Sequence, residues 1–335
     1  MMKTAGFTIL EFLIATTIGT LLIAGIGAVY LSNKATFSIQ SALARLQENG
    51  RYANYVLARD IRMAGFQGCT NQRQVTLTNL VSNYSTMLNY DKPLQGFSSS
   101  GTSFTPSLPA NISSKAPVAG NDIIEVRMAS SNGVHLSADM AQANSAINVY
   151  SGLGAQSGTP LIITNCVIGN IFMAGAGTDN TTITHPTGVN NSDNLSIAYL
   201  TNAQVMRLLY YAFYIKNTGR VNNLNQPIFS LVRLSANGNE DEIAEGVERL
   251  QITYGVDTDS DNTVNSYQTA AQVNTANNWN NVISVHVNLL LATVDNVADR
   301  PRPYTFNGVT TTPTDRKIRR EWVMFITLRN RGLPV

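Results

Sequence analysis

Ionisable side chains are scarce in this chain, and so are histidine and cysteine. Only 13% of the residues are charged, against 44% that are hydrophobic, and the formal net charge is +2. A balance so close to neutral gives no electrostatic reason to expect a nucleic acid or an acidic surface as partner. Asn, Thr, Ser and Gly are abundant through the middle of the chain, which is more typical of extracytoplasmic β proteins than of cytosolic enzymes.

The usual catalytic motifs are also missing from the sequence. It contains no G-x-S-x-G, no H-E-x-x-H and no phosphate-binding glycine loop. The three histidines, His135, His185 and His286, are far apart and have no recognisable partner spacing. His286 alternates with apolar residues, which indicates an outward-facing residue of a strand. We therefore expect that the protein is not an enzyme.

One long apolar run lies at the N-terminus, behind the short leader Met1-Met2-Lys3-Thr4-Ala5. From Phe12 to Leu31 there is no charge in twenty residues. A helix of that length spans about 30 Å at 1.5 Å per residue, which is the hydrocarbon thickness of a bilayer. The sequence therefore predicts a membrane-spanning helix.

Glu11 lies inside this apolar block, one helical turn after Phe7. A lone carboxylate at that depth costs at least a few kcal/mol, so it needs a partner. If cleavage freed the amine of Phe7, that cation could pair with Glu11 of an adjacent subunit. The alternative is that Glu11 snorkels to the headgroup interface of an ordinary signal anchor. A removed secretory signal fits less well, because the run is too long and has no small-x-small cleavage site.

The string Gly6-Phe7-Thr8-Ile9-Leu10-Glu11 resembles the prepilin motif of type IV pilins and type II secretion pseudopilins. The resemblance implies that a prepilin peptidase cuts after Gly6 and N-methylates Phe7, and that Glu11 is an assembly residue. It implies a leader (1–6), a transmembrane and assembly half of a helix (7–31), an amphipathic half (32–65) and a globular head (66–335). The implied location is the inner membrane, with a single pass and a periplasmic head, and the pilus after assembly.

Downstream of Leu31, the sequence predicts that the same helix continues to Ala64, with Gly65 as its stop signal. No proline appears before Pro93, and apolar residues keep a helical spacing. The expected apolar stripe consists of Ile39, Leu43, Leu46, Ala53, Leu57 and Ile61.

Strand patterns dominate the rest of the chain, and short turn-rich connections between them predict antiparallel pairing. The expected strands are Asp122–Met128, Pro160–Val167, Ser196–Leu200, Val205–Ile215, Phe229–Leu234, Glu248–Val256, Val282–Thr293 and Glu321–Leu328. The predicted fold class is α+β, with a pilin-like N-terminal helix packed on an antiparallel β-sheet head that carries loop insertions. The aromatic cluster Tyr210, Tyr211, Phe213 and Tyr214 is assigned to the core under the helix rather than to a binding face.

Further stretches resemble the PilW family of minor pilins. They are Arg59–Phe66 with Gly68-Cys69, Ala244–Gln251 with Tyr254–Asp257, and Arg319-Arg320 with Phe325–Arg331. The resemblance implies a minor pilin that joins other minor pilins and the major pilin to initiate or cap a type IV pilus. The alternatives are a minor pseudopilin of type II secretion, or an adhesin-like binding protein at the pilus tip or on the membrane, with the loops between Thr70 and Asn194 as its binding surface.

Two sites remain in the head. Cys69 and Cys166 are an even number of cysteines in an exported domain, which favours one disulfide over two buried thiols. Asp257, Asp259 and Asp261 alternate as in the opening of a calcium loop. However, Asn262 replaces the glycine of the sharp turn and Gln268 the bidentate glutamate, so a solvated Asp-rich hairpin turn is the alternative to Ca²⁺ binding.

Overall fold

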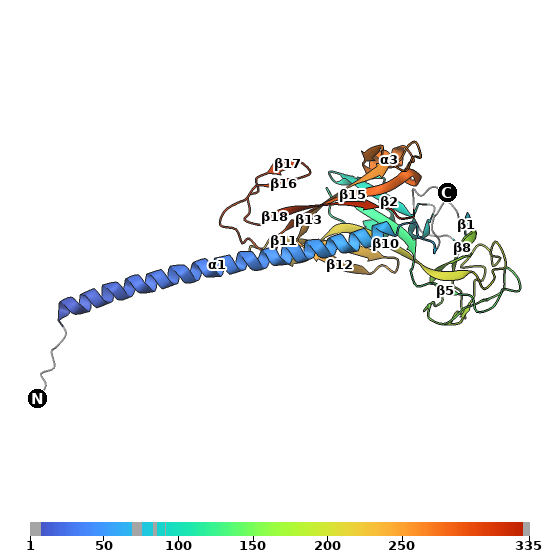
Figure 1. The fold of residues 1–335 in the computed structure, drawn as a ribbon, viewed down its shortest axis with the longest axis horizontal. Coiled ribbons are helices and arrows are strands. Elements are labelled where there is room, and N and C mark those ends of the chain that lie inside the picture. The colour runs from blue at the N-terminus through green and yellow to red at the C-terminus, as the bar shows by residue number, and fades with distance from the viewer. Residues whose placement is uncertain (1–7, 69–75, 83–85, 91, 331–335) are drawn as a thin grey trace, which may run out of the picture.

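The computed structural model describes residues 8–68, 76–82, 86–90 and 92–330. One helix, α1 (Ile9–Arg62), leads into a β-rich head that is fastened along the second half of the helix (Figure 1). Its 54 residues make a rod about 80 Å long. The prediction of one continuous helix is confirmed, and Gly65, at a φ of 78°, follows shortly after its end.

The other elements are short helices and strands. In chain order they are β1 (Thr76–Asn79), β2 (Leu94–Ser100), β3 (Ser103–Thr105), α2 (Ala110–Ser113), β4 (Ile123–Ala129), β5 (Val134–His135), β6 (Ile147–Asn148), β7 (Pro160–Thr164), β8 (Ile168–Met173), β9 (Thr182–Ile183), β10 (Gln204–Val221), β11 (Pro227–Ser235), β12 (Glu240–Glu245), β13 (Val247–Val256), β14 (Ser266–Gln268), α3 (Ala270–Thr275), β15 (Val282–Ala292), β16 (Tyr304–Phe306), β17 (Val309–Thr311) and β18 (Arg319–Thr327). Single 3-10 turns cover Thr86–Leu88 and Trp279–Asn281.

Two large sheets form most of the head, and the described residues add two small two-stranded sheets, β16-β17 and β6-β9. In the described residues, a ten-stranded sheet has the order β1-β8-β7-β10-β4-β2-β3, and β5, β11 and β12 extend it around β10. A four-stranded sheet has the order β14-β13-β15-β18. Antiparallel pairing is confirmed for the predicted strands that form, whereas β1 and β8, which the structure adds, run parallel to each other. The observed class is a helix packed on antiparallel-rich sheets, which is α+β.

The main core joins α1 to both sheets. Leu46, Ala53, Leu57 and Ile61 are at most 3% exposed and pack among side chains of β4, β10, β13, β15 and β18. The predicted apolar stripe is therefore confirmed, although Ile39 and Leu43 at its start are only half-buried. Gly50 lies against the indole of Trp322, where a Cβ would come within 2.5 Å of a ring carbon. This close contact brings the helix against β18.

The aromatic cluster on β10 is divided between two cores. Phe213 is buried in the main core with α1, whereas Tyr210 and Tyr214 belong to another core with Phe97. Alternate side chains of a strand point to opposite faces, so these neighbours could not all lie under the helix. The assignment to the core is confirmed for these three, while Tyr211 is half-buried, and the common position under α1 was wrong.

A separate core organises the insertion between β4 and β10. It contains Leu136, Ile147, Leu153, Phe172 and Tyr199, all at most 5% exposed. Figure 1 places this lobe, around β5, at the end of the head farthest from the protruding helix. The expected strand Ser196–Leu200 was wrong: Ile197, Ala198 and Tyr199 pack into this lobe as irregular chain, so burial there does not depend on a strand ladder, and Leu200 is 54% exposed.

Candidate functional site

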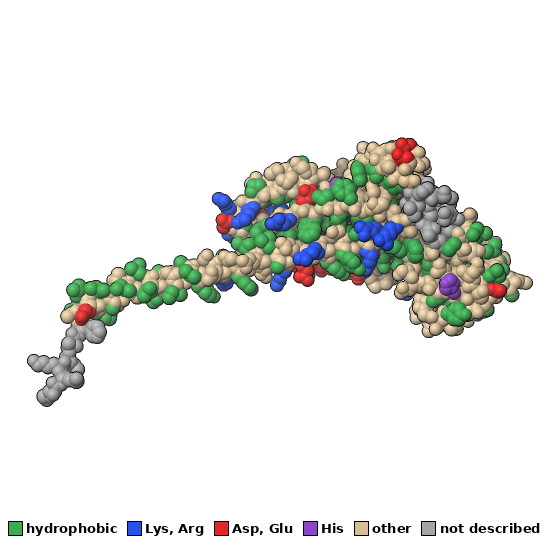
Figure 2. All heavy atoms as spheres, viewed as in Figure 1, with side chains coloured by type: hydrophobic (Ala, Val, Ile, Leu, Met, Phe, Trp, Pro, Cys, Tyr) green, Lys and Arg blue, Asp and Glu red, His purple; other side chains and the backbone are tan. Residues whose placement is uncertain are grey.

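The first half of α1 extends beyond the main body of the head, and none of its side chains is buried by the described part of the chain. Side chains from Ile9 to Ser38 are exposed, including Ile9 at 82%, Ile23 at 72% and Phe37 at 73%. Figure 2 shows apolar side chains covering this rod. The helix is long and apolar enough to cross a membrane, and no residue of its most apolar stretch is buried. Such a surface requires lipid or other apolar helices around it.

Glu11 takes part in capping the N-terminus of this helix. Its carboxylate Oε2 accepts from the Thr8 amide at 2.9 Å and from the Thr8 hydroxyl at 3.0 Å. In return, the Glu11 amide donates to Thr8 Oγ1 at 3.3 Å, which completes a capping box. The T-x-x-E spacing is a recognised signature of this motif, and sequence reasoning overlooked it. Glu11 therefore has a local partner in the single chain.

The cleavage site cannot be placed in the same way. Gly6 and Phe7 lie outside the described residues, so processing after Gly6 and pairing of a freed Phe7 amine with Glu11 stay predictions. The capping box is compatible with that pairing, because both of its bonds to the carboxylate end on Oε2. Hydrogen bonds from the described residues leave the second oxygen of Glu11 as an acceptor for an amine.

Polar contacts fix the angle between helix and head. Asp60, 3% exposed, accepts from Arg59 at 2.7 Å and from Arg233 of β11 at 3.2 Å. Nearer the N-terminus of the helix, the side-chain amide of Asn49 donates to the main-chain carbonyl of Glu245 at 2.9 Å. A buried charge without partners is costly, so the Asp60 contacts hold α1 in one position on the sheet. The protruding half is consequently a fixed extension of the head.

The acidic turn between β13 and β14 brings its three carboxylates together. Oxygens of Asp257, Asp259 and Asp261 lie within 4.8 Å of one another. Asn262 adopts a φ of 65°, so it supplies the left-handed conformation for which glycine was expected. Asp257 is 5% exposed and accepts from the amides of Ser260 and Asn262 at 2.7 and 3.0 Å. The turn resembles a ligand loop in shape.

Internal hydrogen bonds hold the same turn as a hairpin. Hydrogen bonds from the Thr263 hydroxyl and amide keep the pKa of Asp261 below its usual value. Asp259 accepts from the Asn265 side chain at 3.2 Å. Oxygen ligands of this kind suit Ca²⁺, but the bonds also satisfy the carboxylates of an ion-free turn. Calcium binding therefore stays a prediction.

Only one of the two cysteines of the predicted disulfide lies within the described residues. Cys166 lies in the turn between β7 and β8, at a φ of 68°, and its amide donates to Thr164 Oγ1 at 3.0 Å. Cys69 lies outside the described residues. The pairing of Cys69 with Cys166 stays a prediction.

A cleft of about 590 Å³ interrupts the ten-stranded sheet, and sequence reasoning missed it. Pairing of β10 with β7 reaches Arg207, and pairing with β11 resumes at Tyr211. Tyr210 lies opposite Arg127 of β4, but the Arg127 amide donates to the Pro93 carbonyl and the Arg127 carbonyl accepts from the Gly65 amide. The two residues therefore share no main-chain hydrogen bond, and the amide and carbonyl of Tyr210 point away from β4. The main-chain edge of β10 thus faces a partly apolar hollow. No local sequence pattern marks this cleft, because distant segments form it.

Comparison with known families gives one result. A family model described as Type IV Pilus-assembly protein W matches residues 212–330. Comparisons with curated proteins and with solved structures found no match. The matched segment forms the second half of β10 and β11 to β18, and it therefore supplies the whole four-stranded sheet against which α1 packs. This match supports a role in type IV pilus assembly for a chain whose C-terminal part is similar to the PilW family.

Proposed function

We propose that this chain is a minor pilin of the PilW type, which joins other minor pilins and the major pilin to initiate or cap a type IV pilus. The observation that carries the proposal is the division of α1 into an exposed apolar half and a half packed on the head. The match over residues 212–330 favours pilus assembly over the type II secretion alternative. The proposed role is structural and includes no catalytic step.

In this proposal the chain is inserted in the inner membrane with its head in the periplasm. Prepilin peptidase removes residues 1–6 and methylates the new amine of Phe7. On assembly, that amine meets Glu11 of a neighbouring subunit, which already holds its own helix cap through Thr8. Because a charged pair shielded from water is tolerable and an unpaired charge is not, the contact favours one register between subunits.

Glu11→Val tests this step. The substitution removes an intramembrane charge, so insertion should be at least as efficient as in the parent. Assembly should suffer, because the partner amine is left unpaired at a cost of about 3 to 5 kcal/mol. That cost is roughly two to three and a half powers of ten in association. The measurement is co-purification of the inserted variant with partner pilins, together with pilus counts.

Glu11→Gln is the matched control, since it keeps an oxygen for the Thr8 bonds and removes the charge. Intact mass should first show that both variants begin at N-methylated Phe7. We expect both to lose partner recovery. If Glu11→Gln assembled normally while Glu11→Val failed, Glu11 would act through the helix cap alone. Normal recovery of both would contradict an assembly role for Glu11.

The cleft beside β10 favours a second candidate function, that of an adhesin-like binding protein. Its volume of about 590 Å³ is within the range of ligand sites, and it combines apolar walls with main-chain groups. A thermal-shift screen of sugars and short peptides on the full chain in detergent would test it. A ligand whose effect disappears in Met173→Trp, which fills the cleft wall, would support binding; no shift with any ligand would leave assembly as the function.

A further inference from the structure

The end of the head that faces the N-terminal half of α1 lies at a defined height on that helix. A groove of about 470 Å³ is lined by Lys34 and Phe37 on one side and by Val294, Asp295 and Val297 on the other. Lys34 and Phe37 follow Leu31, the last residue of the uncharged run, by about 5 and 9 Å of helix rise. The headgroup layer of a bilayer is about 5 to 8 Å thick on each side. Lys34 thus lies within this layer and Phe37 just beyond it, and the helix wall of the groove continues to Asn49. The membrane-facing end of the groove therefore adjoins the headgroup layer if the apolar run spans the membrane, and the loop between β15 and β16 forms its other wall.

This membrane-proximal surface is rich in exposed cations. We define it by its exposed charged residues, which are Lys34, Arg300, Arg302 and Arg316 with Asp295 and Asp299. Four cations thus stand against two carboxylates, and one of these, Asp299, pairs with Arg302 at 3.2 Å. Figure 2 shows Lys and Arg side chains gathered at this end of the head, beside the base of the protruding helix. The nearby Arg220 pairs with both Glu242 and Glu245, so this group carries one net negative charge, which reduces the positive balance without reversing it.

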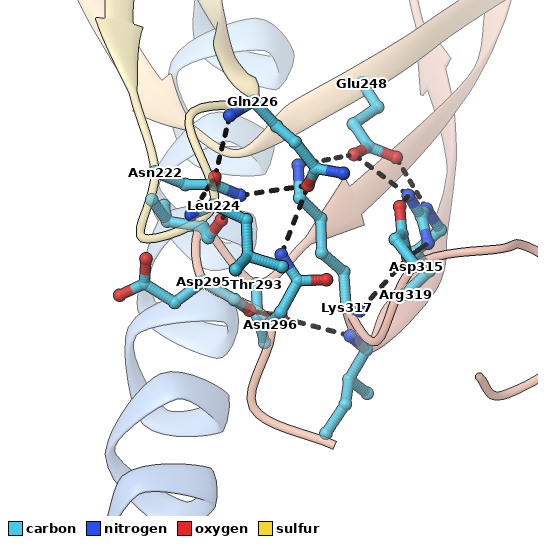
Figure 3. Close-up of polar contacts among 12 residues, drawn as sticks. Asn222, Leu224, Gln226, Glu248, Thr293, Asp295, Asn296, Asp315, Lys317 and Arg319 are labelled. Atoms are coloured by element: carbon cyan, nitrogen blue, oxygen red, sulfur yellow. Dashed lines mark hydrogen bonds and ion pairs between the residues drawn. The ribbon is translucent and has the colours of Figure 1, made fainter. Parts of the chain in front are cut away.

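Other charges near this surface are neutralised inside the head. Glu248 binds Arg319 at 2.6 Å and Lys317 at 3.3 Å, and Arg319 also binds Asp315 at 2.6 Å (Figure 3). Hydrogen bonds from Arg319 hold the pKa of Asp315 below its usual value. These four groups contain two cations and two anions, so they balance one another. Of the exposed cations beside them, Arg302 pairs with Asp299 at 3.2 Å, whereas Lys34, Arg300 and Arg316 form no ion pair with described residues.

A buried amide network holds the loops that carry the arginines. Asn296, 8% exposed, donates to Gln226 at 3.1 Å and accepts from the Arg316 amide at 2.8 Å. Asn222 donates to the carbonyl of Val294 at 3.0 Å (Figure 3). The network ties the β10–β11 hairpin to the segments on both sides of the β16–β17 hairpin. The cations are consequently displayed by a pre-organised surface, which reduces the ordering cost of binding.

We propose that this surface rests on the membrane and binds anionic phospholipid headgroups through Lys34, Arg300, Arg302 and Arg316. The inference depends on the proposed insertion of α1, which fixes the height of the surface. Cations at headgroup depth meet phosphates directly while the chain is in the bilayer, which favours lipid over an acidic protein partner. Each cation near an anionic membrane strengthens binding about fivefold at moderate salt. The contact orients the head before assembly and is lost when the subunit leaves the membrane.

Hydrogen–deuterium exchange of the full chain in nanodiscs tests the proposal. One set of discs contains phosphatidylcholine alone, and the other includes about 30% phosphatidylglycerol. Segments 293–303 and 311–318 should exchange about tenfold more slowly in the anionic discs at low salt. High salt should remove the difference, because the screening length falls to about 3 Å at 1 M.

The triple variant Arg300→Gln, Arg302→Gln, Arg316→Gln should lose this lipid-dependent protection. The control variant Arg62→Gln, Arg207→Gln, Arg329→Gln changes the same net charge at exposed positions outside the surface and should keep it. Equal exchange in both kinds of disc would overturn the inference. So would a triple variant that keeps the protection but loses partner pilins, since the surface would then bind protein. Failure of the parent to enter nanodiscs would instead contradict the proposed insertion.

Discussion

The two halves of α1 share one helix and differ in everything around it. From Ile9 to Ser38 the side chains are exposed, although most of the large ones are apolar. From Leu46 to Ile61 a stripe of small and medium apolar residues is buried in the main core, and polar residues such as Arg51 face outward. The packed half has the ordinary pattern of a surface helix, whereas the protruding half is apolar all round.

This difference separates the part of α1 that stabilises the folded head from the part that determines where the head is held. The packed half is part of the head, because its stripe fills the space between the two sheets and Asp60 anchors it through Arg233. The protruding half contributes no side chain to the hydrophobic cores formed by the described residues. Its apolar surface is satisfied only by something outside the chain, which is the physical basis for proposing a membrane and then a bundle of partner helices.

Truncating one leucine in each half of α1 should reveal the largest difference between the two halves. Leu57→Ala removes a fully buried side chain from the main core and should lower the free energy of unfolding of the head by about 2 to 5 kcal/mol. Leu21→Ala, at a position that is 68% exposed, should leave head stability unchanged. Chemical denaturation of the full chain in detergent measures both. Equal losses would mean that the protruding half also packs on the head.

Removing the predicted disulfide should act on the head alone. Cys69→Ser with Cys166→Ser should cost the head about 2 to 4 kcal/mol, because a closed loop of nearly a hundred residues restricts the unfolded chain. Membrane association through the protruding half should not change. Thermal unfolding and membrane flotation test the two statements separately. Non-reducing peptide mapping that found both cysteines as free thiols in the exported protein would contradict the pairing.

Calcium should produce the smallest effect and again only in the head. If the acidic turn binds the ion, an ion concentration about tenfold above Kd stabilises the folded state by about 1.4 kcal/mol. Asp259→Ala should remove that increment, whereas Asp139→Ala, an exposed carboxylate in another loop, should not. Thermal unfolding with and without millimolar calcium is the measurement. No shift in the parent would establish the ion-free hairpin turn.

Much of the fold was predictable because its main elements carry periodic patterns. Helical spacing predicted α1, and alternation or continuous apolar runs predicted β10, β13, β15 and β18. On β15 both faces are covered, and His286 is the half-buried exception, stacked on Phe325 at 4.3 Å. These are segments whose local sequence agrees with their final environment.

Elements that depend on distant partners were missed. β12 is mostly acidic, and acidic residues are unfavourable in strands, but Glu240 pairs with Lys216 and Asp241 with Arg233. β2 contains Gly96, which weakens a strand pattern, yet only glycine admits the Tyr254 hydroxyl there, since a Cβ would lie 2.0 Å from it. In both cases tertiary contacts outweigh local preference.

The candidate sites also differ in whether consecutive residues or distant segments form them. Glu11 and the three aspartates were identified because each site lies within a few consecutive residues, and the structure places the aspartates together. The cleft beside β10 and the membrane-proximal surface combine segments more than a hundred residues apart, so no local motif could indicate them. The capping box at Thr8 did have a local signal.

Site-specific photo-crosslinking from α1 tests the central claim most directly. A photoreactive phenylalanine analogue in place of Ile23, in the protruding half, should crosslink to phospholipid before assembly and to partner pilin helices in assembling cells. The same analogue at Tyr55, an exposed position 61% accessible on the packed half, should give no lipid adducts, because it lies more than 30 Å along the helix from Leu31. Ile23 adducts with neither lipid nor pilin, in cells that produce the intact chain, would contradict the account.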